Sequence, residues 1–281
     1  MIQIKLSSGL GNQLFMYAFY KYIEKKYNEL PYFDDRYFEW AKIERKSELS
    51  IIFPDYPIHR FFFNPAGHRK ILRNLFEFKQ KIFPDYKYVF EVDYDDNILY
   101  RGNVYFSGFW QTSKYVDTLD KKLFVPQEPI PPCIQYYLRL IEKSVTPISI
   151  HFRRGDYFMP KWIGRYGVCT TNYYNNAMQA LSSCEDKPKT YFVFSDDIEW
   201  VKNNIIFKDD FIIVENADVN SFWYIYLMSK CHHNIISNST FSWWGAYLND
   251  FENKVVIGPD KWMLDSDFDL MQPNWLKISH K

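Results

Sequence analysis

Two adjacent arginines are the strongest chemical feature of this sequence. Residues 151–157 read His-Phe-Arg-Arg-Gly-Asp-Tyr, so Arg153 and Arg154 directly follow an apolar run. A guanidinium group can donate two parallel hydrogen bonds to a phosphate, and each charge-assisted bond contributes about 1.5–3 kcal/mol. The pair therefore predicts a site that holds a diphosphate without a metal ion. The alternative interpretation is a pair of surface arginines that bridge to Asp156.

A second polar run has the composition of an anion site. Residues 237–242 read Ser-Asn-Ser-Thr-Phe-Ser, and they leave a predicted strand and enter a predicted helix. Hydroxyl groups and free backbone N–H groups at a helix N-terminus bind anions. Ordinary N-capping by Ser239 or Thr240 is the alternative. Next to the arginines, this run would form the second half of a phosphate cradle.

A glycine loop lies near the N-terminus. Residues 8–13 read Ser-Gly-Leu-Gly-Asn-Gln, between a strand pattern at 2–6 and a helical pattern. Leu14 stands where a dinucleotide-binding fingerprint has its third glycine, so that fingerprint is absent. Gly9 and Gly11 would let the backbone approach a ligand, and Asn12 would cap the helix or contact a sugar. A tight turn without a ligand is the alternative.

Carboxylates follow another predicted strand. Ser195, Asp196 and Asp197 stand at its end, where they can bind ribose hydroxyls, a base edge or a metal ion. Helix N-capping by one of the two aspartates is the alternative. Asp93 and Asp95 form a D-x-D pair of the kind that holds a divalent ion over a nucleotide diphosphate. They lie in a region without periodic pattern, where a surface turn is the favoured interpretation.

These polar runs are positioned by short apolar strands that alternate with helices. Such an alternation indicates βαβ units and a parallel sheet, whose ligands bind beyond the carboxyl ends of the strands. The predicted strands of the second half are 147–152, 190–194, 211–214, 234–237 and 254–257, and the predicted helices are 172–181, 198–203, 221–231 and 243–249.

A proline-rich segment divides the chain. Residues 125–132 contain four prolines, which forbid both a helix and a central strand, so this segment is the best linker candidate. We therefore predict one domain over residues 1–132 and a second over residues 133–281. Residues 31–130 are rich in Phe, Tyr, Asp and Pro and give no clear pattern.

The composition limits the class of protein. The 281 residues include 34 basic and 34 acidic side chains, and this zero net charge argues against binding of duplex nucleic acid. Apolar residues make up 47% and charged residues 24%, which excludes a disordered or fibrous protein. Aromatic residues make up 20%, and we expect most of them in the core.

Several features predict a cytoplasmic protein. The sequence shows no signal peptide and no apolar run long enough to span a bilayer. Four widely separated cysteines form no C-x-x-C pair, so we expect reduced, mostly buried thiols and no zinc site. The basic and aromatic stretch 60–73 would bring the protein to the inner membrane surface, or it is a solvated face; the solvated face is favoured.

Four of these motifs together resemble the family-11 glycosyltransferases, the α-1,2-fucosyltransferases. They are residues 9–13, 151–157, 194–197 and 238–248, in the family's order. The resemblance implies an α/β architecture of GT-B type, with two Rossmann-like domains around a cleft. Residues 1–132 would then be the acceptor side with the glycine loop, and residues 133–281 would bind the nucleotide sugar.

The resemblance also implies the reaction. GDP-fucose would be the donor substrate, with no metal ion or other cofactor. Fucose would be transferred with inversion at its anomeric carbon to the 2-hydroxyl of an acceptor sugar, commonly a galactoside. The expected partners are the nucleotide sugar and an oligosaccharide or lipid-linked glycan, and the sequence does not specify which glycan is used.

Roles for individual residues follow from the same resemblance. Arg153 would hold the diphosphate with support from Arg154, and His151 would lie near the nucleotide. Asn12 would face the fucose and the leaving oxygen. Other donor-binding residues are expected in the glycine loop, after the strand that ends near residue 194, and at the helix start that meets the phosphates from the other side: Gly9, Gly11, Gln13, Ser195, Asp196, Asp197, Asn238, Ser239, Thr240, Phe241 and Ser242.

Two positions depart from the family pattern. Tyr224 stands where the family usually has an aspartate, and in related fucosyltransferases such an acidic residue pairs with guanine. Asp218 or Asp196 would then take over base recognition, or the donor base differs. Ser8 replaces the first glycine of the family's Gly-Gly-Leu-Gly.

The predicted mechanism is a single displacement in which Arg153 stabilises the charge that develops on the leaving phosphate. Asp156 is the best-placed carboxylate for a general base; otherwise it orients Arg154, or the leaving phosphate itself takes the proton. Three further alternatives stay open at this point. They are a different nucleotide-sugar donor, a metal-dependent transferase that uses Asp93 and Asp95, and a glycan-binding protein without catalysis.

Overall fold

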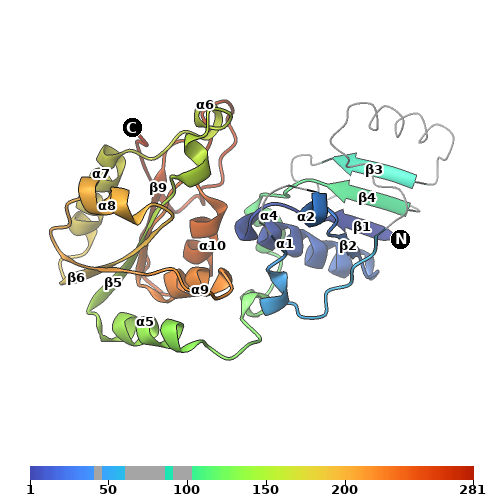
Figure 1. The fold of residues 1–281 in the computed structure, drawn as a ribbon, viewed down its shortest axis with the longest axis horizontal. Helices are drawn as coiled ribbons and strands as arrows, with labels where there is room; N and C mark the ends of the chain where they lie inside the picture. Colours follow the sequence, from blue (N-terminus) through green and yellow to red (C-terminus); the bar gives the residue numbers. More distant parts are fainter. Residues whose placement is uncertain (41–45, 61–85, 91–102) are drawn as a thin grey trace. The chain divides into compact units, whose positions relative to one another are not determined.

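The computed structural model describes residues 1–40, 46–60, 86–90 and 103–281. The chain forms two compact units, Met1–Gln127 and Glu128–Lys281 (Figure 1). The division falls inside the proline-rich segment. Asp93, Asp95 and all but the first residue of the basic stretch 60–73 lie outside the described residues.

Unit 1 is built on a parallel sheet of four strands in the order β2-β1-β4-β3. Its long helix, α1 (Leu10–Tyr27), confirms the helical pattern of the sequence, but it begins inside the predicted glycine loop of residues 8–13, so Gly11, Asn12 and Gln13 belong to its first turn. The other elements are β1 (Ile2–Lys5), β2 (Tyr32–Asp34), β3 (Tyr86–Phe90), β4 (Asn103–Ser107), α2 (Tyr37–Trp40), α4 (Ser113–Val116), η1 (Leu49–Ile51) and η2 (Lys121–Phe124).

Aromatic side chains form much of the core described in unit 1. Phe19 of α1 is fully buried and stacks on Trp110, with ring centroids 4.0 Å apart and planes 7° from parallel. Phe106 and Tyr115 meet the Phe19 ring edge-on, with ring centroids 5.2 and 5.1 Å from it. These packing geometries are the favourable ones for aromatic pairs. Here the aromatic surplus of the sequence serves the core, as expected.

Unit 2 is built on a parallel sheet of six strands in the order β10-β9-β8-β5-β6-β7. Every residue of β5 (Thr146–Phe152) is buried, as is typical of a central strand in a parallel sheet. The other strands are β6 (Lys189–Ser195), β7 (Asp210–Ile213), β8 (His233–Ile235), β9 (Val256–Pro259) and β10 (Leu276–Ile278). The sequence analysis found all of these strands except β10.

The strand order of unit 2 reverses between β5 and β8. From β5 the chain runs outward to β6 and β7, and it then returns to β8 on the other side of β5. The connections on the two sides of such a switch point lead in opposite directions, which leaves a crevice above the carboxyl ends of the two strands. The arginine run follows β5 and the Ser-Asn-Ser-Thr run follows β8, so the topology brings both to this crevice.

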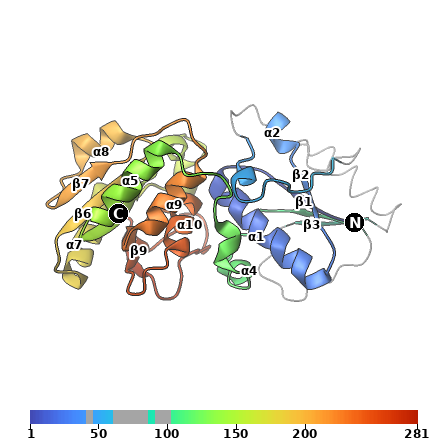
Figure 2. The ribbon, with the colours of Figure 1, turned by 90° about the horizontal axis from the view of Figure 1, so that it is seen from below.

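Helices cover both faces of the sheet in unit 2. Figure 2 shows α5 (Pro132–Lys143), α9 (Phe222–Lys230) and α10 (Thr240–Leu248) grouped together, and α9 contacts both of the others. The other face carries α7 (Thr171–Cys184) and α8 (Ile198–Asn204). Between β5 and α7 stand η3 (Gly155–Phe158) and α6 (Ile163–Tyr166), which the sequence analysis did not predict.

Helix α5 corrects the interpretation of the proline-rich segment. Pro131 is its N-cap and Pro132 its first residue. Proline is favoured at this position because its missing N–H group would have no intrahelical acceptor and its φ angle already suits the helix. The last prolines of the segment therefore start a helix, whereas the sequence analysis treated all four as excluding one.

The four cysteines are free, and their environments differ. Cys169 and Cys231 are buried, and burial raises the pKa of the Cys169 thiol to about 12 and that of Cys231 further. Cys133 is half-buried, and Cys184, the last residue of α7, is exposed.

No helix in the described part of the chain has the length and apolar character needed to cross a bilayer.

A buried amide network links β5, β8 and α10. Asn234 donates to Ser149 Oγ at 2.6 Å and to the Met228 carbonyl at 2.9 Å, and its own carbonyl accepts from Asn249 at 2.7 Å. All three polar atoms would lose a partner together if this side chain were removed. The network therefore fixes β8 and the end of α10 relative to β5.

We expect Asn234→Ala to lower the free energy of unfolding by about 1–3 kcal/mol, because buried polar groups would be left without partners. Asn204→Ala is the matched control, since its amide donates to the Trp200 carbonyl at an exposed helix end and its loss should cost less than about 0.5 kcal/mol. Urea denaturation of the two variants measures the difference. Equal losses would contradict the network's structural role.

Candidate active site

The candidate site begins with a hydrogen bond across the switch point of unit 2. His151 Nδ1 lies 2.9 Å from Ser237 Oγ, which joins the end of β5 to the loop after β8. Burial, and secondarily the charge of Arg153, lowers the pKa of His151 to about 3. The imidazole is therefore neutral at physiological pH, and it supports the loop after β8 without adding charge.

Arg153 is held by two carboxylates. One guanidinium nitrogen donates to Asp196 Oδ2 at 2.7 Å and the other to Asp156 Oδ1 at 2.5 Å. About a quarter of the side chain stays exposed, 26% by area. The two contacts fix the plane of the guanidinium before any ligand arrives, and this is the preorganisation that stabilisation of a phosphate charge requires.

Arg154 has a different environment from its neighbour. Its guanidinium carbon lies 3.6 Å from the centre of the Trp200 ring and 4.5 Å from that of Phe158, and Nε donates to Asp197 Oδ2 at 3.2 Å. Only 14% of the side chain is exposed. These contacts anchor the loop after β5 to α8. Arg154 therefore supports the loop beside Arg153.

Gly155 allows this loop to pass close to the next strand. A Cβ atom built on it would lie 2.6 Å from Asp196 Oδ2, a distance that real Cβ contacts do not show. The same carboxylate accepts the backbone N–H of Arg154 at 2.9 Å. Without a side chain at 155, Asp196 can bind the loop backbone and Arg153 together.

The remaining residues after β6 have local contacts. Asp197 Oδ1 accepts the backbone N–H of Trp200 at 3.1 Å, so Asp197 is the N-cap of α8, the interpretation that the sequence analysis gave as the alternative. Ser195 Oγ accepts the backbone N–H of Asp197 at 2.9 Å. Of the two carboxylates in this run, Asp196 therefore binds Arg153, whereas Asp197 caps α8 and binds Arg154.

The loop after β8 is buried and tied to several segments. The Asn238 side-chain amide donates to the Tyr166 carbonyl at 2.8 Å, and the backbone carbonyl of Asn238 accepts from the Tyr157 hydroxyl at 3.0 Å. Ser239 is the N-cap of α10 and accepts the backbone N–H of Phe241 at 3.4 Å. The run thus starts a helix of nine residues beside the end of β5. Such a start binds anions.

The side chains at the start of α10 differ in exposure. Ser242 is buried, and its hydroxyl donates to the Ser239 carbonyl at 3.3 Å. Thr240 and Phe241 are half-buried, and the Phe241 ring lies 5.7 Å from the His151 ring. Thr240 and Phe241 are therefore the most exposed residues of this run, and Phe241 is the one next to His151.

The glycine loop forms a second constellation, within unit 1. The Gly9 carbonyl accepts the backbone N–H groups of Asn12 and Gln13, which starts α1. Asn12 Nδ2 donates to Ser8 Oγ at 2.9 Å. Gln13 is fully buried, and its side-chain amide donates to the Ser8 and Lys46 carbonyls at 2.9 and 3.1 Å. Its side-chain oxygen accepts the backbone N–H of Glu48 at 3.0 Å, so Gln13 fixes the path of the loop.

Tyr224 lies at the start of α9 and holds the segment that follows β7. Its hydroxyl accepts the backbone N–H of Ala217 at 2.6 Å and lies 3.5 Å from the Glu215 carbonyl. Burial raises the pKa of this phenol. Asp218, on the same segment, is exposed, whereas Asp196 is already engaged by Arg153. Of the two substitutes considered for base recognition, Asp218 is the one open to solvent.

Several residues of the site carried no recognisable signal in the sequence. Tyr157, Phe158 and Trp200 surround the arginines, but in this aromatic-rich chain their residue type alone does not distinguish them. Gly155 was noted only as part of the arginine run. Gln111 donates to Asn12 Oδ1 at 2.7 Å, although the two residues are 99 positions apart in the sequence. No local pattern reveals a contact at that separation.

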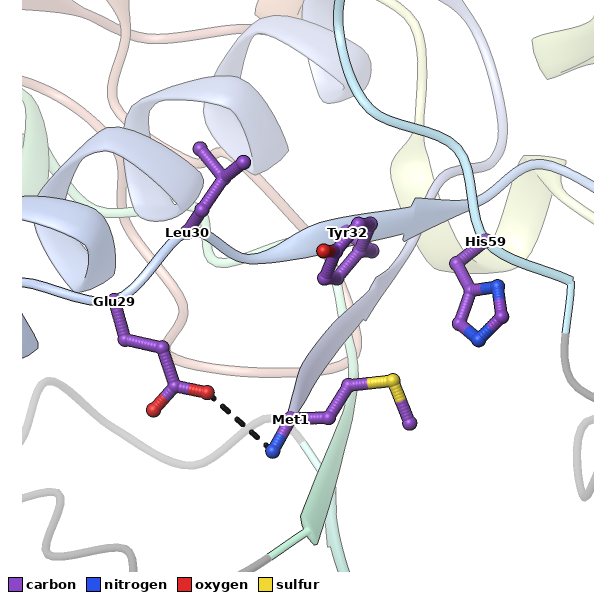
Figure 3. A pocket seen from close by; sticks show the side chains of 5 residues that line it. All are labelled: Met1, Glu29, Leu30, Tyr32 and His59. Carbon is purple, nitrogen blue, oxygen red and sulfur yellow. Dashed lines mark ion pairs between the residues drawn. The ribbon is translucent and has the colours of Figure 1, made fainter.

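No cluster of three or more metal-ligating side chains is present in residues 1–40, 46–60, 86–90 and 103–281. A hollow of about 490 Å³ in unit 1 is lined by Met1, Glu29, Leu30, Tyr32 and His59 (Figure 3). It lies at the amino end of β1, whereas the glycine loop follows the carboxyl end, and its Glu29 pairs with the Met1 amino group at 3.3 Å. None of the predicted site residues lines it.

Two α/β units, each built on a parallel sheet, are the architecture of GT-B glycosyltransferases, and unit 2 carries arginines and a helix start at its switch point. The chain belongs to glycosyl transferase family 11, whose family model matches residues 1–279. The resemblance seen in four motifs is confirmed, and with it the enzyme class, a glycosyltransferase of the fucosyltransferase family. Family membership sets aside the alternative of a glycan-binding protein without catalysis.

Two bacterial glycosyltransferases match nearly the whole chain, and a galactoside fucosyltransferase matches part of it. An α-1,2-colitosyltransferase from Escherichia coli is 30% identical over 98% of this chain and 97% of its own length. The O-antigen biosynthesis glycosyltransferase WbnK from Escherichia coli is 27% identical over 97% and 99%. A galactoside α-(1,2)-fucosyltransferase 1 from Ateles belzebuth is 33% identical, over 38% of this chain and 30% of its own length.

Solved structures confirm the fold class expected from the sequence. The fucosyltransferase NodZ from Bradyrhizobium superposes with a TM-score of 0.54, covering 88% of this chain and 92% of NodZ at 14% identity. The Arabidopsis thaliana FUT1 mutant R284K in complex with GDP superposes with a TM-score of 0.50, covering 93% and 71% at 13% identity. At such identities the likeness concerns the fold alone.

Gly155→Ala tests the close approach of the loop to Asp196. We expect the added methyl group to displace the Asp196 carboxylate and to lower the free energy of unfolding by about 1–3 kcal/mol, as overpacking does. Gly164→Ala is the control, because no atom lies within 4 Å of a Cβ at that position. In an Asp196→Ala background the further loss from Gly155→Ala should disappear; a loss that persists there would refute the contact.

The pKa of His151 predicts a pH dependence of stability. An unfolded imidazole titrates near ~6.5, so between about pH 6.5 and 3 the unfolded chain binds one more proton than the folded chain. The free energy of unfolding therefore falls with decreasing pH in this window, by up to ~1.4 kcal/mol per pH unit from this group. A His151→Gln variant should show a shallower dependence in urea denaturation; an unchanged slope would contradict a buried neutral imidazole.

Proposed function

We propose that the protein is an inverting, metal-independent fucosyltransferase that moves L-fucose from GDP-fucose to the 2-hydroxyl of an acceptor sugar, a galactoside in a surface glycan. One observation carries the proposal. Arg153 is held by two carboxylates at the switch point of unit 2, next to the start of α10. A fixed guanidinium and a helix N-terminus together form a site for a diphosphate that needs no metal ion.

The relatives support the same chemistry. An α-1,2 linkage is named for both the colitosyltransferase and the galactoside fucosyltransferase. NodZ, named as an α-1,6-fucosyltransferase, has been studied with GDP and with GDP-fucose. The linkage named for these two relatives and the donor studied with NodZ are those of the proposal.

The proposed reaction is a single displacement. The acceptor hydroxyl oxygen forms a bond to the anomeric carbon, while the bond from that carbon to the phosphate oxygen breaks and its electron pair remains on the leaving GDP. Arg153 and the first N–H groups of α10 stabilise that charge, because Arg153 is held by Asp156 and Asp196 before the donor binds and a helix start attracts anions. Asn12, in the glycine loop, faces the fucose and the leaving oxygen.

The proton of the acceptor hydroxyl has two proposed destinations. Asp156 is a candidate general base, and it also accepts a hydrogen bond from Arg153 at 2.5 Å. This contact favours a role for Asp156 in orienting an arginine. The arginine that it binds is Arg153, whereas the sequence analysis named Arg154. In that case the leaving phosphate takes the proton.

A donor that carries a different sugar is the second candidate. The relative that is 30% identical over nearly the whole chain is named a colitosyltransferase, so fucose is not the sugar of every relative. Tyr224, which anchors the segment after β7 where the family usually has an aspartate, also supports testing other nucleotides. A lipid-linked acceptor and peripheral contact with the inner membrane surface stay part of the proposal. A metal-dependent transferase that uses Asp93 and Asp95 stays an alternative to it.

The first test measures nucleotide release from GDP-fucose, with and without a β-galactoside acceptor, in excess EDTA. We expect release that depends on the acceptor and is unaffected by EDTA. UDP- and ADP-sugars and GDP-colitose are assayed in parallel. Loss of release in EDTA would favour the metal-dependent alternative, and turnover of another donor alone would transfer the same mechanism to that donor. NMR of the product's anomeric proton reports inversion.

Arg153→Ala should lower kcat by about 100-fold or more, because a preorganised charge donor contributes about 2.7–4 kcal/mol to the transition state. Arg153→Lys should restore little of this, since an ammonium group lacks the planar pair of donors. Arg139→Ala, an exposed arginine on α5, is the control. An Arg153→Ala variant with most of its activity would disprove the phosphate cradle.

Asp156→Asn separates the two proposed destinations of the proton. A general base contributes about 100- to 10,000-fold, so a loss in that range with a changed pH profile indicates base catalysis. If Asp156 orients Arg153, we expect a loss of about tenfold or less and an unchanged pH profile. Steady-state kinetics between pH values on both sides of neutrality make the distinction.

A further inference from the structure

The loop after β4 meets the glycine loop at one edge of the sheet in unit 1. Strands β1 and β4 are parallel neighbours, with Ile4 paired to Phe106. The segments that follow them therefore emerge at the same edge (Figure 1). The first segment carries Ser8 and Asn12, and the second carries Trp110 and Gln111.

The Asn12 carboxamide is engaged at both of its ends. Gln111 Nε2 donates to Asn12 Oδ1 at 2.7 Å, and Asn12 Nδ2 donates to Ser8 Oγ at 2.9 Å. An asparagine amide has an acceptor end and a donor end that are nearly equal in shape, so only such contacts decide which way it faces. Here the two contacts select one orientation.

Both partners of Asn12 depend on unusual backbone. Ser8 has φ 69° and Trp110, next to Gln111, has φ 56°. In the described part of the chain, the third non-glycine residue with positive φ is Asn28, an ordinary helix C-cap. Left-handed backbone is costly for serine and tryptophan, and it persists only where the surroundings over-determine it.

Packing holds the strained tryptophan in place. Trp110 is 1% exposed and stacks on Phe19 of α1 at 4.0 Å. Its indole nitrogen has no hydrogen-bond partner among the described residues, so apolar contact fixes the ring. Since Phe19 and Asn12 belong to the same helix, this packing also sets where Gln111 stands relative to Asn12.

We propose that Ser8 and Gln111 are positioning residues that hold the Asn12 carboxamide in its orientation for sugar transfer. This inference rests on the proposed function, in which Asn12 faces the donor sugar and the leaving oxygen. Ser8 is then more than a tolerated replacement for the family's glycine. Its backbone is left-handed, a conformation that suits glycine, and its hydroxyl binds Asn12.

A purely structural role makes a different prediction. If Ser8 only continues the chain, glycine should serve better, because glycine adopts positive φ without strain. Ser8→Gly should then raise stability and leave turnover unchanged. If Ser8 orients Asn12, the same variant should be at least as stable as the wild type and yet turn over more slowly.

The experiment compares Ser8→Gly, Gln111→Ala and the double variant, assayed with whichever donor the wild type turns over. We expect kcat to fall about threefold to tenfold in each single variant, the effect of one neutral hydrogen bond, with donor KM within about twofold. The double variant should be no slower than about the slower single variant, since either loss frees the same carboxamide. The melting temperature of Ser8→Gly should equal or exceed that of the wild type.

Two further variants complete the test. Gln111→Glu should be slower than Gln111→Ala, because it places a carboxylate oxygen against Asn12 Oδ1. Gln127→Ala is the matched control, because its amide donates to the Val125 carbonyl at an exposed site and its loss should leave kcat unchanged. Unchanged kcat in both single variants, or losses that multiply in the double variant, would overturn the inference.

Asn12→Ala distinguishes this inference from the proposed function. If Asn12→Ala is slow while the Ser8 and Gln111 variants are not, only the positioning role is wrong. If Asn12→Ala keeps nearly full activity, the role of Asn12 in the proposed function is wrong, and the positioning role with it. The expected order places Asn12→Ala below both single variants.

Discussion

The parallel pairing of β5 with β8 is the constraint on which the candidate site depends. It places the ends of two strands side by side where the strand order reverses, and His151 and Ser237 join them by a buried hydrogen bond. Because the imidazole there is neutral, the positive charge of the edge resides on the two arginines that follow. Several groups orient these arginines: Asp156 and the carboxylates after β6, and the Trp200 and Phe158 rings around Arg154. Gly155 lets the loop after β5 approach Asp196, and the start of α10 completes the site.

Much of the fold follows from the sequence, because its strands and helices are local patterns. The buried run of β5 and the alternation after it identify the parallel sheet of unit 2. Short or atypical elements escape this reasoning. Strand β10 has only three residues, with Leu276 exposed, so it lacks an apolar pattern. Pro132 starts α5 because proline suits the first position of a helix. The proline-rich composition of the segment indicates a linker and does not reveal that position.

The site was predictable in its residue types but not in its contacts. Strand ends with Arg, Asp and Ser indicate a ligand-binding edge, and the structure brings those residues of unit 2 together. Which arginine is open and which is enclosed depends on Trp200 and Phe158, and the orientation of Asn12 depends on Gln111. These partners are distant in sequence or common in type, so only the tertiary structure reveals them.

The cysteines have a practical consequence for work with this enzyme. A thiol reacts with alkylating reagents as its thiolate, and burial with a raised pKa protects Cys169 and Cys231. Cys184 is exposed at the end of α7, just before β6 begins, and so lies at the opposite edge of the sheet from the arginines. A maleimide should therefore attach there first, which allows immobilisation or fluorescent labelling of the wild-type chain with the donor edge left accessible.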